Sequence, residues 1–301
     1  MEFQDRYIIF LDIEFQNFNI KSKQYHYILE LGIIIFEKGK EMPILIEHVN
    51  FPILDFPNMR LIGVEYSSVS EETEIKMIKN QDKLIISADL EDIKKKQKLI
   101  NYIPNKMVKI YLKDAILNND SKRIEENKEL IEKQAKKAMY TYFYYYIPKD
   151  YKKVFENQIE LYKSDKLVKE RLVNPKEYLV KLNKYLKNGL LVHKEGTDLE
   201  ALRNDFNYYK IKSEIESKKC FDIAVYNKYF EKLNSASLHK SYLYLYENKI
   251  NNEKDKNKDK DLLKYHNKIL DLVNLKMDKF KAHNPLVDSF MTIFIFILMK
   301  K

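Results

Sequence analysis

The chain has 301 residues, enough for one large domain or for one domain that carries a sizeable insertion. Hydrophobic residues make up 45% and charged residues 33%, with only 5 glycines and 7 prolines, which excludes the disordered, collagen-like and linker-rich classes. The formal net charge of +9 favours an anionic partner, with nucleic acid first and an acidic membrane surface second.

The single cysteine, Cys220, excludes an internal disulfide framework and a zinc site built from several cysteines, and it favours a reducing compartment. The N-terminus has no basic region before a long apolar run, so we expect no signal peptide. The apolar run Phe290–Met299 has ten residues, whereas a membrane span needs about 20. We therefore expect a cytoplasmic protein without stable membrane insertion, whose last helix is buried, with a tail anchor as the alternative.

The first 50 residues predict three strands. Tyr7–Leu11 is a continuous apolar run typical of a strand covered on both faces, and Ile28–Phe36 is rich in β-branched residues. Pro43–Val49 follows a short turn that contains glycine. We interpret Gln16–Gln24 as a polar turn. The short connections predict an antiparallel meander.

Between residues 51 and 174 the pattern changes to helical periodicity, in Glu72–Ile78, Ile124–Tyr146 and Tyr151–Val173. We interpret residues 51–174 as a mostly helical insertion into a domain formed by residues 1–50 and 175–301. The tyrosine cluster Tyr140–Tyr146 has two interpretations, packing within the insertion or stacking on nucleic-acid bases.

The remaining chain predicts helices alternating with short strands. Asn174 before Pro175 is a helix start, and Gly189 is expected at the end of that helix. This order predicts an α/β fold, a ribonuclease-H-like mixed five-stranded sheet flanked by helices. The other expected elements are strands at Leu190–His193 and Lys219–Ile223, helices at Asp198–Phe206, Ser237–Tyr246, Leu262–Met277 and Pro285–Met299, and a charged loop at Ile250–Lys260.

Two carboxylates, Asp12 and Glu14, follow the first apolar run. In an extended chain, residues two apart point to the same side, so these carboxylates are expected to lie together. Burying carboxylates is costly unless they are paired or bind a metal, and convergent oxygen ligands suit Mg²⁺ or Mn²⁺. The alternative is a strand end that returns to solvent.

Two further acids, Asp198 and Asp288, each lie beside an apolar element, at the start of a predicted helix where the helix dipole also favours them. Four carboxylates at one sheet edge would repel one another unless cations were bound, and two divalent ions would satisfy them. His283 falls in the loop before the last helix. A neutral imidazole there is suited to accept a proton from an attacking water.

The acidic residues and His283 belong to three short motifs that follow one another along the chain. These are Phe10-Leu-Asp-Ile-Glu-Phe15 with Glu30-Leu-Gly32, then Leu191-Val-His-Lys-Glu-Gly-Thr-Asp198, and then His283-Asn-Pro-Leu-Val-Asp288 leading into a helix. Together they resemble the motifs of the DEDDh 3′–5′ exonucleases, the DnaQ-like branch of the ribonuclease-H-like superfamily. The resemblance covers roughly residues 6–50 and 186–298, and residues 51–173 have no counterpart.

The resemblance implies an enzyme that removes nucleoside 5′-monophosphates from the 3′ ends of single-stranded RNA, or of DNA as second choice. The insertion would be a cap that binds substrate or a protein partner. The alternative is a non-catalytic nucleic-acid-binding or protein-interaction module on the same fold. The implied ligands of two Mg²⁺ or Mn²⁺ ions are Asp12, Glu14, Asp198 and Asp288, and the implied general base is His283.

The chain departs from the family pattern at four positions. Lys194 stands in place of the usual asparagine and would contact a phosphate. Phe15 stands where many members have threonine, and either stacking on the terminal nucleotide or packing would explain it. Pro285 and Ser289 replace alanines of the third motif. None of these changes removes a metal ligand or the base.

Several other polar residues are weighed and set aside. Asp205 and Asp222 compete with Asp198 for the place of the third carboxylate, but Asp198 has the better spacing from the strand. His193 is expected to make a structural hydrogen bond, and Cys220 to be a core residue. No metal-ligand spacing is found for His26, His48, His239 and His266.

Overall fold

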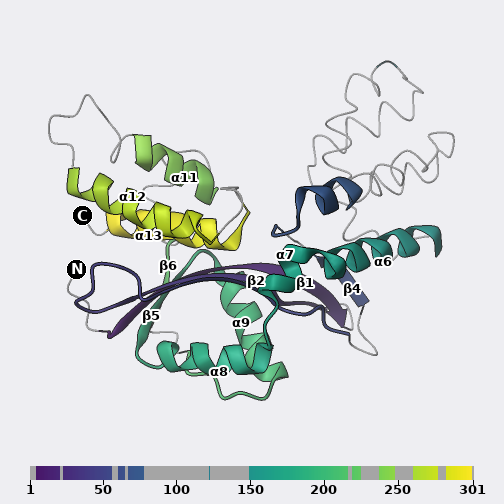
Figure 1. Ribbon diagram of the computed structural model, residues 1–301. Helices are drawn as coiled ribbons and strands as arrows, with labels where there is room; N and C mark the ends of the chain where they lie inside the picture. Colours follow the sequence, from purple (N-terminus) through teal and green to yellow (C-terminus); the bar gives the residue numbers. More distant parts are fainter. Residues whose placement is uncertain are drawn as a thin grey trace.

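The computed structural model describes residues 5–20, 23–55, 60–64, 67–77, 122, 149–215, 219–224, 237–247, 260–276 and 283–299. These residues form an α/β structure in which a mixed sheet has helices on both faces (Figure 1). Helices α11, α12 and α13 lie over one face, and α8 and α9 lie over the other. Helices α6 and α7 lie on the same side as α13, over the other end of β1 (Figure 1).

The sheet begins with the expected antiparallel meander. Strands β1 (Tyr7–Ile20), β2 (Lys23–Glu37) and β3 (Leu45–Asn50) are paired in turn, antiparallel throughout. Strand β5 (Gly189–His193) then pairs parallel with β1, and β6 (Cys220–Asp222) pairs parallel with β5. The resulting strand order is β3-β2-β1-β5-β6.

A sixth strand corrects the expectation of five. Strand β4 (Arg60–Val64), within the segment expected to be a mostly helical insertion, pairs antiparallel with the end of β1. The interpretation of Gln16–Gln24 as a polar turn is also wrong, because β1 and β2 continue through most of it. Gln16 is buried, and its amide donates to the carbonyl oxygens of Ile28 (2.7 Å) and Pro52 (3.1 Å). These hydrogen bonds to distant residues thus stabilise a strand that its polar composition does not predict.

The helix expected at Tyr151–Val173 is two helices, α6 (Lys149–Ser164) and α7 (Lys166–Arg171). Asp165 separates them, since its carboxylate accepts from the backbone N–H groups of the first turn of α7 and caps that helix. Residues 71–77 are helical, close to expectation. The expected helix Ile124–Tyr146, the tyrosine cluster and residues 250–259 of the charged loop lie outside the described residues.

Helix α8 (Pro175–Leu186) starts as expected, with the Asn174 side chain accepting from Lys176 and Glu177 N–H. Gly189 does not end this helix but begins β5, where a Cβ would lie 2.8 Å from both Ile9 and the Tyr185 carbonyl oxygen. The remaining helices lie near their expected positions. They are α9 (Gly196–Tyr208), α11 (Leu238–Leu245), α12 (Lys260–Asn274) and α13 (Pro285–Met299).

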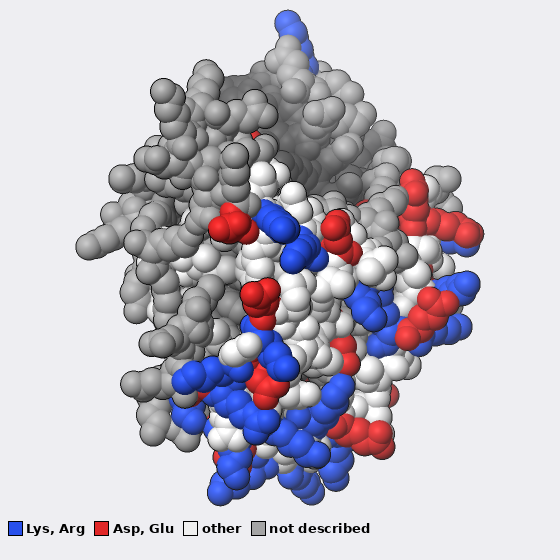
Figure 2. Space-filling view, turned by 60° about the vertical axis from the view of Figure 1, so that its left-hand side comes forward, with Lys and Arg blue, Asp and Glu red and all other residues white. Residues whose placement is uncertain are grey.

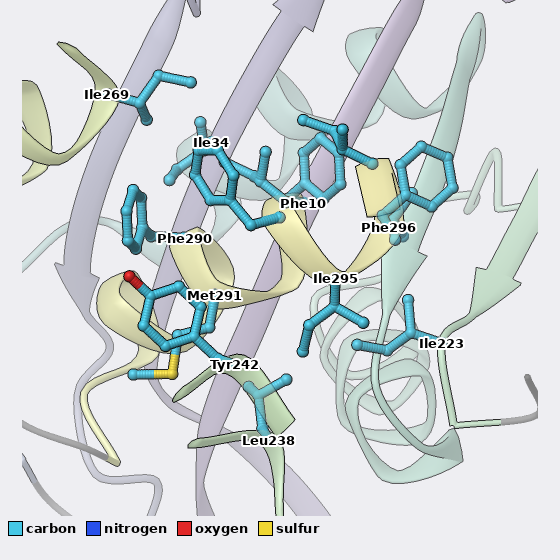
Figure 3. Packing of buried hydrophobic residues seen from close by; sticks show 14 of the residues in the cluster. Phe10, Ile34, Ile223, Leu238, Tyr242, Ile269, Phe290, Met291, Ile295 and Phe296 are labelled. Carbon is cyan, nitrogen blue, oxygen red and sulfur yellow. The ribbon is translucent and has the colours of Figure 1, made fainter. Parts of the chain in front are cut away.

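Helix α13 covers one face of the sheet. Its aromatic and aliphatic side chains, including Phe290 and Phe296, pack against Phe10 and Ile34 of the sheet and Tyr242 of α11 (Figure 3). None of the described helices is both long enough and apolar enough to cross a membrane. The residues of α13 from Pro285 to Ile297 are buried, so the last apolar run is a core helix, as expected.

The first turn of α13 lies directly on Gly32 of β2. A methyl group at Gly32 would overlap the backbone of Pro285 and Leu286, so only glycine permits this approach. The Ser289 hydroxyl donates to the Gly32 carbonyl oxygen at 2.9 Å and locks the contact. This contact holds Asp288 above β1.

Candidate functional site

A cavity of about 390 Å³ lies where β1, the β5–α9 turn and the starts of α11 and α13 meet. Seven residues singled out in the sequence line it, although they come from three distant parts of the chain. They are Asp12, Glu14, Phe15, Lys194, Asp198, His283 and Asp288. The other lining residues are Ile13, Glu195, Thr197, Ser237, Leu238 and His239.

The sheet register explains how Asp12 and Asp198 come together. Phe10 faces α13, and Asp12 and Glu14 follow on the same face at the two-residue period of a strand. Phe10 pairs with Val192 of the parallel strand β5, so β5 ends at His193, one residue before the level of Asp12. Helix α9 starts shortly afterwards and carries Asp198 in its first turn.

His283 and Asp288 are placed by the start of α13. His283 has a positive φ of 63°, a conformation that turns the loop toward the cavity. Asn284 caps the helix, because its side-chain oxygen accepts from the N–H groups of Leu286 (3.1 Å) and Val287 (3.4 Å). Side-chain atoms of Glu14, His283 and Asp288 all lie within 4.8 Å of one another, close enough for one metal ion.

The carboxylates are crowded and poorly solvated. Asp198 is 4% exposed, and its Oδ2 has no hydrogen-bond partner among the described residues. Burial, followed by the charges of Asp198 and Asp288, raises the pKa of Asp12 well above its ordinary value. Burial, with the charge of Glu195 next, does the same to the pKa of Asp198. Burial also raises the pKa of Asp288 to about 7, opposed by the His283 N–H group and by Lys194.

The residues fit a divalent cation. Hard carboxylate oxygens are the ligands that Mg²⁺ and Mn²⁺ prefer, and the buried Oδ2 of Asp198 has no hydrogen-bond partner within the part of the chain that the structure describes. The carboxylates cannot all be ionised at neutral pH without compensation by positive charge. Lys194 supplies only one such charge, and its ammonium group is already paired with Glu195 at 2.9 Å.

His193 and the two competing aspartates, Asp205 and Asp222, have other roles. His193 is buried, and its Nδ1 lies 2.7 Å from the Glu195 carbonyl oxygen, the structural hydrogen bond that was expected. Asp222 accepts from the N–H groups of Glu195 (3.0 Å) and Ala224 (2.8 Å), which shapes the turn before α9. Asp205 is buried and accepts from Ile28 N–H at 2.8 Å. Neither aspartate lines the cavity, whereas Asp198 does.

Sequence reasoning missed a buried network beside the site. Glu30 lies opposite Glu14 in the register, and it binds His48 Nε2 (3.1 Å) and the N–H and hydroxyl of Ser67 (2.8 and 2.9 Å). Burial would raise the pKa of Glu30, but the interactions with His48 and Ser67 outweigh burial and lower it. The network fastens the chain after β4 to the sheet. The one signal in the sequence for this network is the position of Glu30 within an apolar strand.

His239 was also missed. It was set aside for lack of metal-ligand spacing, yet it lines the cavity from the start of α11, next to Ser237 and Leu238. No local pattern identifies it, because α11 reaches the site only through its packing against α13.

Comparison with protein-family models, with curated proteins and with solved structures finds no match for this chain. The geometry of the cavity and the chemistry of its residues therefore carry the functional argument.

Proposed function

We propose that the chain is a metal-dependent 3′–5′ exonuclease of the DEDDh type, acting on nucleic acid. The observation that carries the proposal is the convergence of four carboxylates and a histidine on one cavity. Asp12, Glu14, Asp198, Asp288 and His283 all line it. A strand end that merely returned to solvent would not gather acids from three distant segments into a poorly hydrated site.

The sheet topology supports the same proposal. A strand order of β3-β2-β1-β5-β6, with an antiparallel meander followed by two parallel strands, is what a ribonuclease-H-like core would have. Strand β4 is an addition at the far end of β1. The acids lie along β1 and at the C-terminal end of β5, where open α/β sheets commonly bind ligands.

Asp12, Glu14, Asp198 and Asp288 would hold two Mg²⁺ or Mn²⁺ ions. Bound there, the ions would supply charge stabilisation for in-line displacement at a phosphodiester. The raised pKa values of Asp12, Asp198 and Asp288 mean that these carboxyls release protons when they become ligands. Cation binding is therefore expected to weaken as the pH falls.

His283 is the proposed general base. Its side chain is exposed to solvent and lies beside Glu14 and Asp288, so it can reach both the carboxylates and an incoming water. A ring nitrogen would accept the proton of the attacking water and pass it to solvent. The loop that carries His283 is anchored by Asn284 at the helix start, which fixes its position relative to Asp288.

The lining of the cavity offers apolar and charged contacts for a terminal nucleotide. Phe15 and Leu238 supply apolar surface, and Lys194 supplies a positive charge for a phosphate. The Phe15 ring also meets His26 edge-on, with ring centroids 5.5 Å apart, so a packing role accompanies any stacking. We propose RNA as the first substrate and DNA as the second, from the Asp-Ile-Glu-Phe form of the first motif.

Hydrolysis of 5′-labelled single-stranded RNA and DNA of one sequence, with Mn²⁺ and with chelator, tests the proposal. The wild type should give a metal-dependent ladder that shortens from the 3′ end, and Asp288→Ala should give none. Asp271→Ala removes an exposed aspartate of α12 and is the matched control, which should cleave like the wild type. Absence of cleavage by folded wild-type protein would overturn the proposal and favour a non-catalytic binding module.

A further inference from the structure

Basic side chains gather on the part of the surface below the sheet, at the level of α8 (Figure 2). Residues 175–188 and 209–215, which form α8 and the segment beside it, contain six lysines and two glutamates. Lys184, Lys187 and Lys212 are exposed. Among the described residues, none forms an ion pair or hydrogen bond with their ammonium groups.

Three hydrogen bonds hold this basic surface together. The Asn183 side chain donates to the Lys212 carbonyl oxygen and accepts from Glu214 N–H, both at 2.9 Å. The Lys219 ammonium group donates to the Lys187 carbonyl oxygen at 3.0 Å. The end of α8 and the segment leading to β6 are therefore fixed side by side, which keeps the lysines close despite their mutual repulsion.

The positive charges continue along the edge of the sheet toward the acidic cavity. Lys219 directly precedes β6, the edge strand. Arg203 of α9 is exposed, and its charge acts on His193 of β5 and on Cys220 of β6. Burial is the largest influence on both groups, and it lowers the pKa of His193 and raises the pKa of Cys220. The positive charge of Arg203 lowers the pKa of both groups. Lys194, immediately after β5, lines the cavity.

The length of this path suits a nucleic-acid strand. From Lys187 to Lys194 the chain is mostly strand β5, and at about 3.3 Å per residue it spans about 20 Å. A stacked strand advances about 3.4 Å along its axis per nucleotide, so about six nucleotides would cover that distance. An ordinary explanation exists for part of the charge, since lysines near the end of α8 also complement its dipole. It does not account for Lys212 or Arg203, which are outside α8.

We propose that Lys184, Lys187, Lys212, Lys219 and Arg203 form a track that binds the phosphates of a single-stranded nucleic acid whose 3′ end occupies the acidic cavity. The inference rests on the proposed function for its substrate. It adds a binding surface on the edge and far face of the sheet, on the side opposite to α6 and α7 (Figure 1). Contacts of this kind are electrostatic and independent of sequence, so binding through the track weakens steeply with salt.

The test measures binding without cleavage. Fluorescence anisotropy with labelled single-stranded RNA, in chelator and over a series of salt concentrations, compares the wild type with Lys184→Ala/Lys187→Ala/Lys212→Ala. The control, Lys38→Ala/Lys40→Ala/Lys268→Ala, removes the same charge from exposed lysines on the β2–β3 turn and α12. Removing three phosphate contacts should reduce the magnitude of the slope of log K against log salt by about two in the track variant. The control variant should keep the wild-type slope.

Strand length separates the track from the cavity. A strand of about 12 nucleotides should lose at least tenfold in affinity for the track variant, whereas one of about 3 nucleotides, too short to reach the lysines, should lose little. Equal losses for track and control variants, or for long and short strands, would overturn the track. So would unchanged RNA binding with lost binding to vesicles containing phosphatidylserine. If the wild type cleaves nothing but the track variant still loses long-strand binding, the exonuclease proposal fails and the track stands.

Discussion

Replacing Asp288 by asparagine should stabilise the protein when no metal is present. Asp288 is 8% exposed, and burial is the main cause that raises the pKa of its carboxyl from 3.8 to about 7. Asparagine has the same shape, and its side-chain oxygen can still accept from the His283 N–H group. The substitution therefore removes the buried charge while keeping the local hydrogen bond.

The sign and size follow from the pKa values. The folded-state pKa lies above the unfolded value, so the folded protein holds this proton more tightly, and stability falls as the pH rises from about 4 to about 7. One pKa unit corresponds to about 1.4 kcal/mol, so ionisation of Asp288 costs about 4 kcal/mol above pH 7. Asp288→Asn should recover much of this, which corresponds to a rise in Tm of about 10 °C.

Thermal and urea unfolding in chelator, at about pH 5 and about pH 8, measure the effect. The stability advantage of Asp288→Asn should be larger at the higher pH, and addition of Mn²⁺ should raise the Tm of the wild type more than that of the variant. Asp271→Asn, at an exposed position of α12, should change neither. A variant no more stable than the wild type at about pH 8 would refute the idea that these acids are crowded charges awaiting a cation.

Two further perturbations test how the site is held and used. Gly32→Ala should destabilise the protein by about 1–3 kcal/mol in thermal unfolding, because its methyl group overlaps the start of α13, whereas Gly196→Ala has open space and should be neutral. An unchanged Tm for Gly32→Ala would show that α13 does not depend on this close approach. His283→Gln should lower kcat for 3′-end cleavage about a hundredfold or more while calorimetry shows Mn²⁺ still binding, and loss of Mn²⁺ binding instead would make His283 a ligand rather than a base.

Much of the candidate site could be predicted from the sequence because its residues interrupt strong local patterns. Asp12 and Glu14 end a run of apolar residues, and Asp288 opens a helix that is otherwise almost entirely apolar. Burying a charged residue in an apolar element is costly unless the charge is compensated, and a shared cation at one edge of the sheet would compensate all of these charges. The strands β1, β2 and β3 were predictable because their apolar runs are followed by short connections, and β5 and β6 because short apolar runs alternate with helical segments.

The features that were missed depend on contacts between distant segments. Gln16 belongs to a strand because the carbonyl oxygens of Ile28 and Pro52 lie beside it, and no local pattern contains that information. Strand β4 forms because β1 offers a free edge beyond the end of β5. The break between α6 and α7 arises at Asp165, which binds Ser70 (2.8 Å) as well as capping α7. In the sequence, an aspartate within a helical pattern is equally consistent with a solvated position on one continuous helix and with a cap between two helices.

The same dependence on distant contacts explains why the acidic cavity and the sheet beneath it are inseparable. Gly32 admits the start of α13, the parallel register of β1 and β5 sets the level of α9, and the Glu30–Ser67 contact fixes the chain that follows β4. The first two of these contacts place residues that line the cavity, Asp288 of α13 and Asp198 of α9. A substitution at any of these positions would change the separation of the carboxylates and hence their mutual repulsion. Their combined effect on cation binding should therefore exceed what their effects on stability alone would suggest.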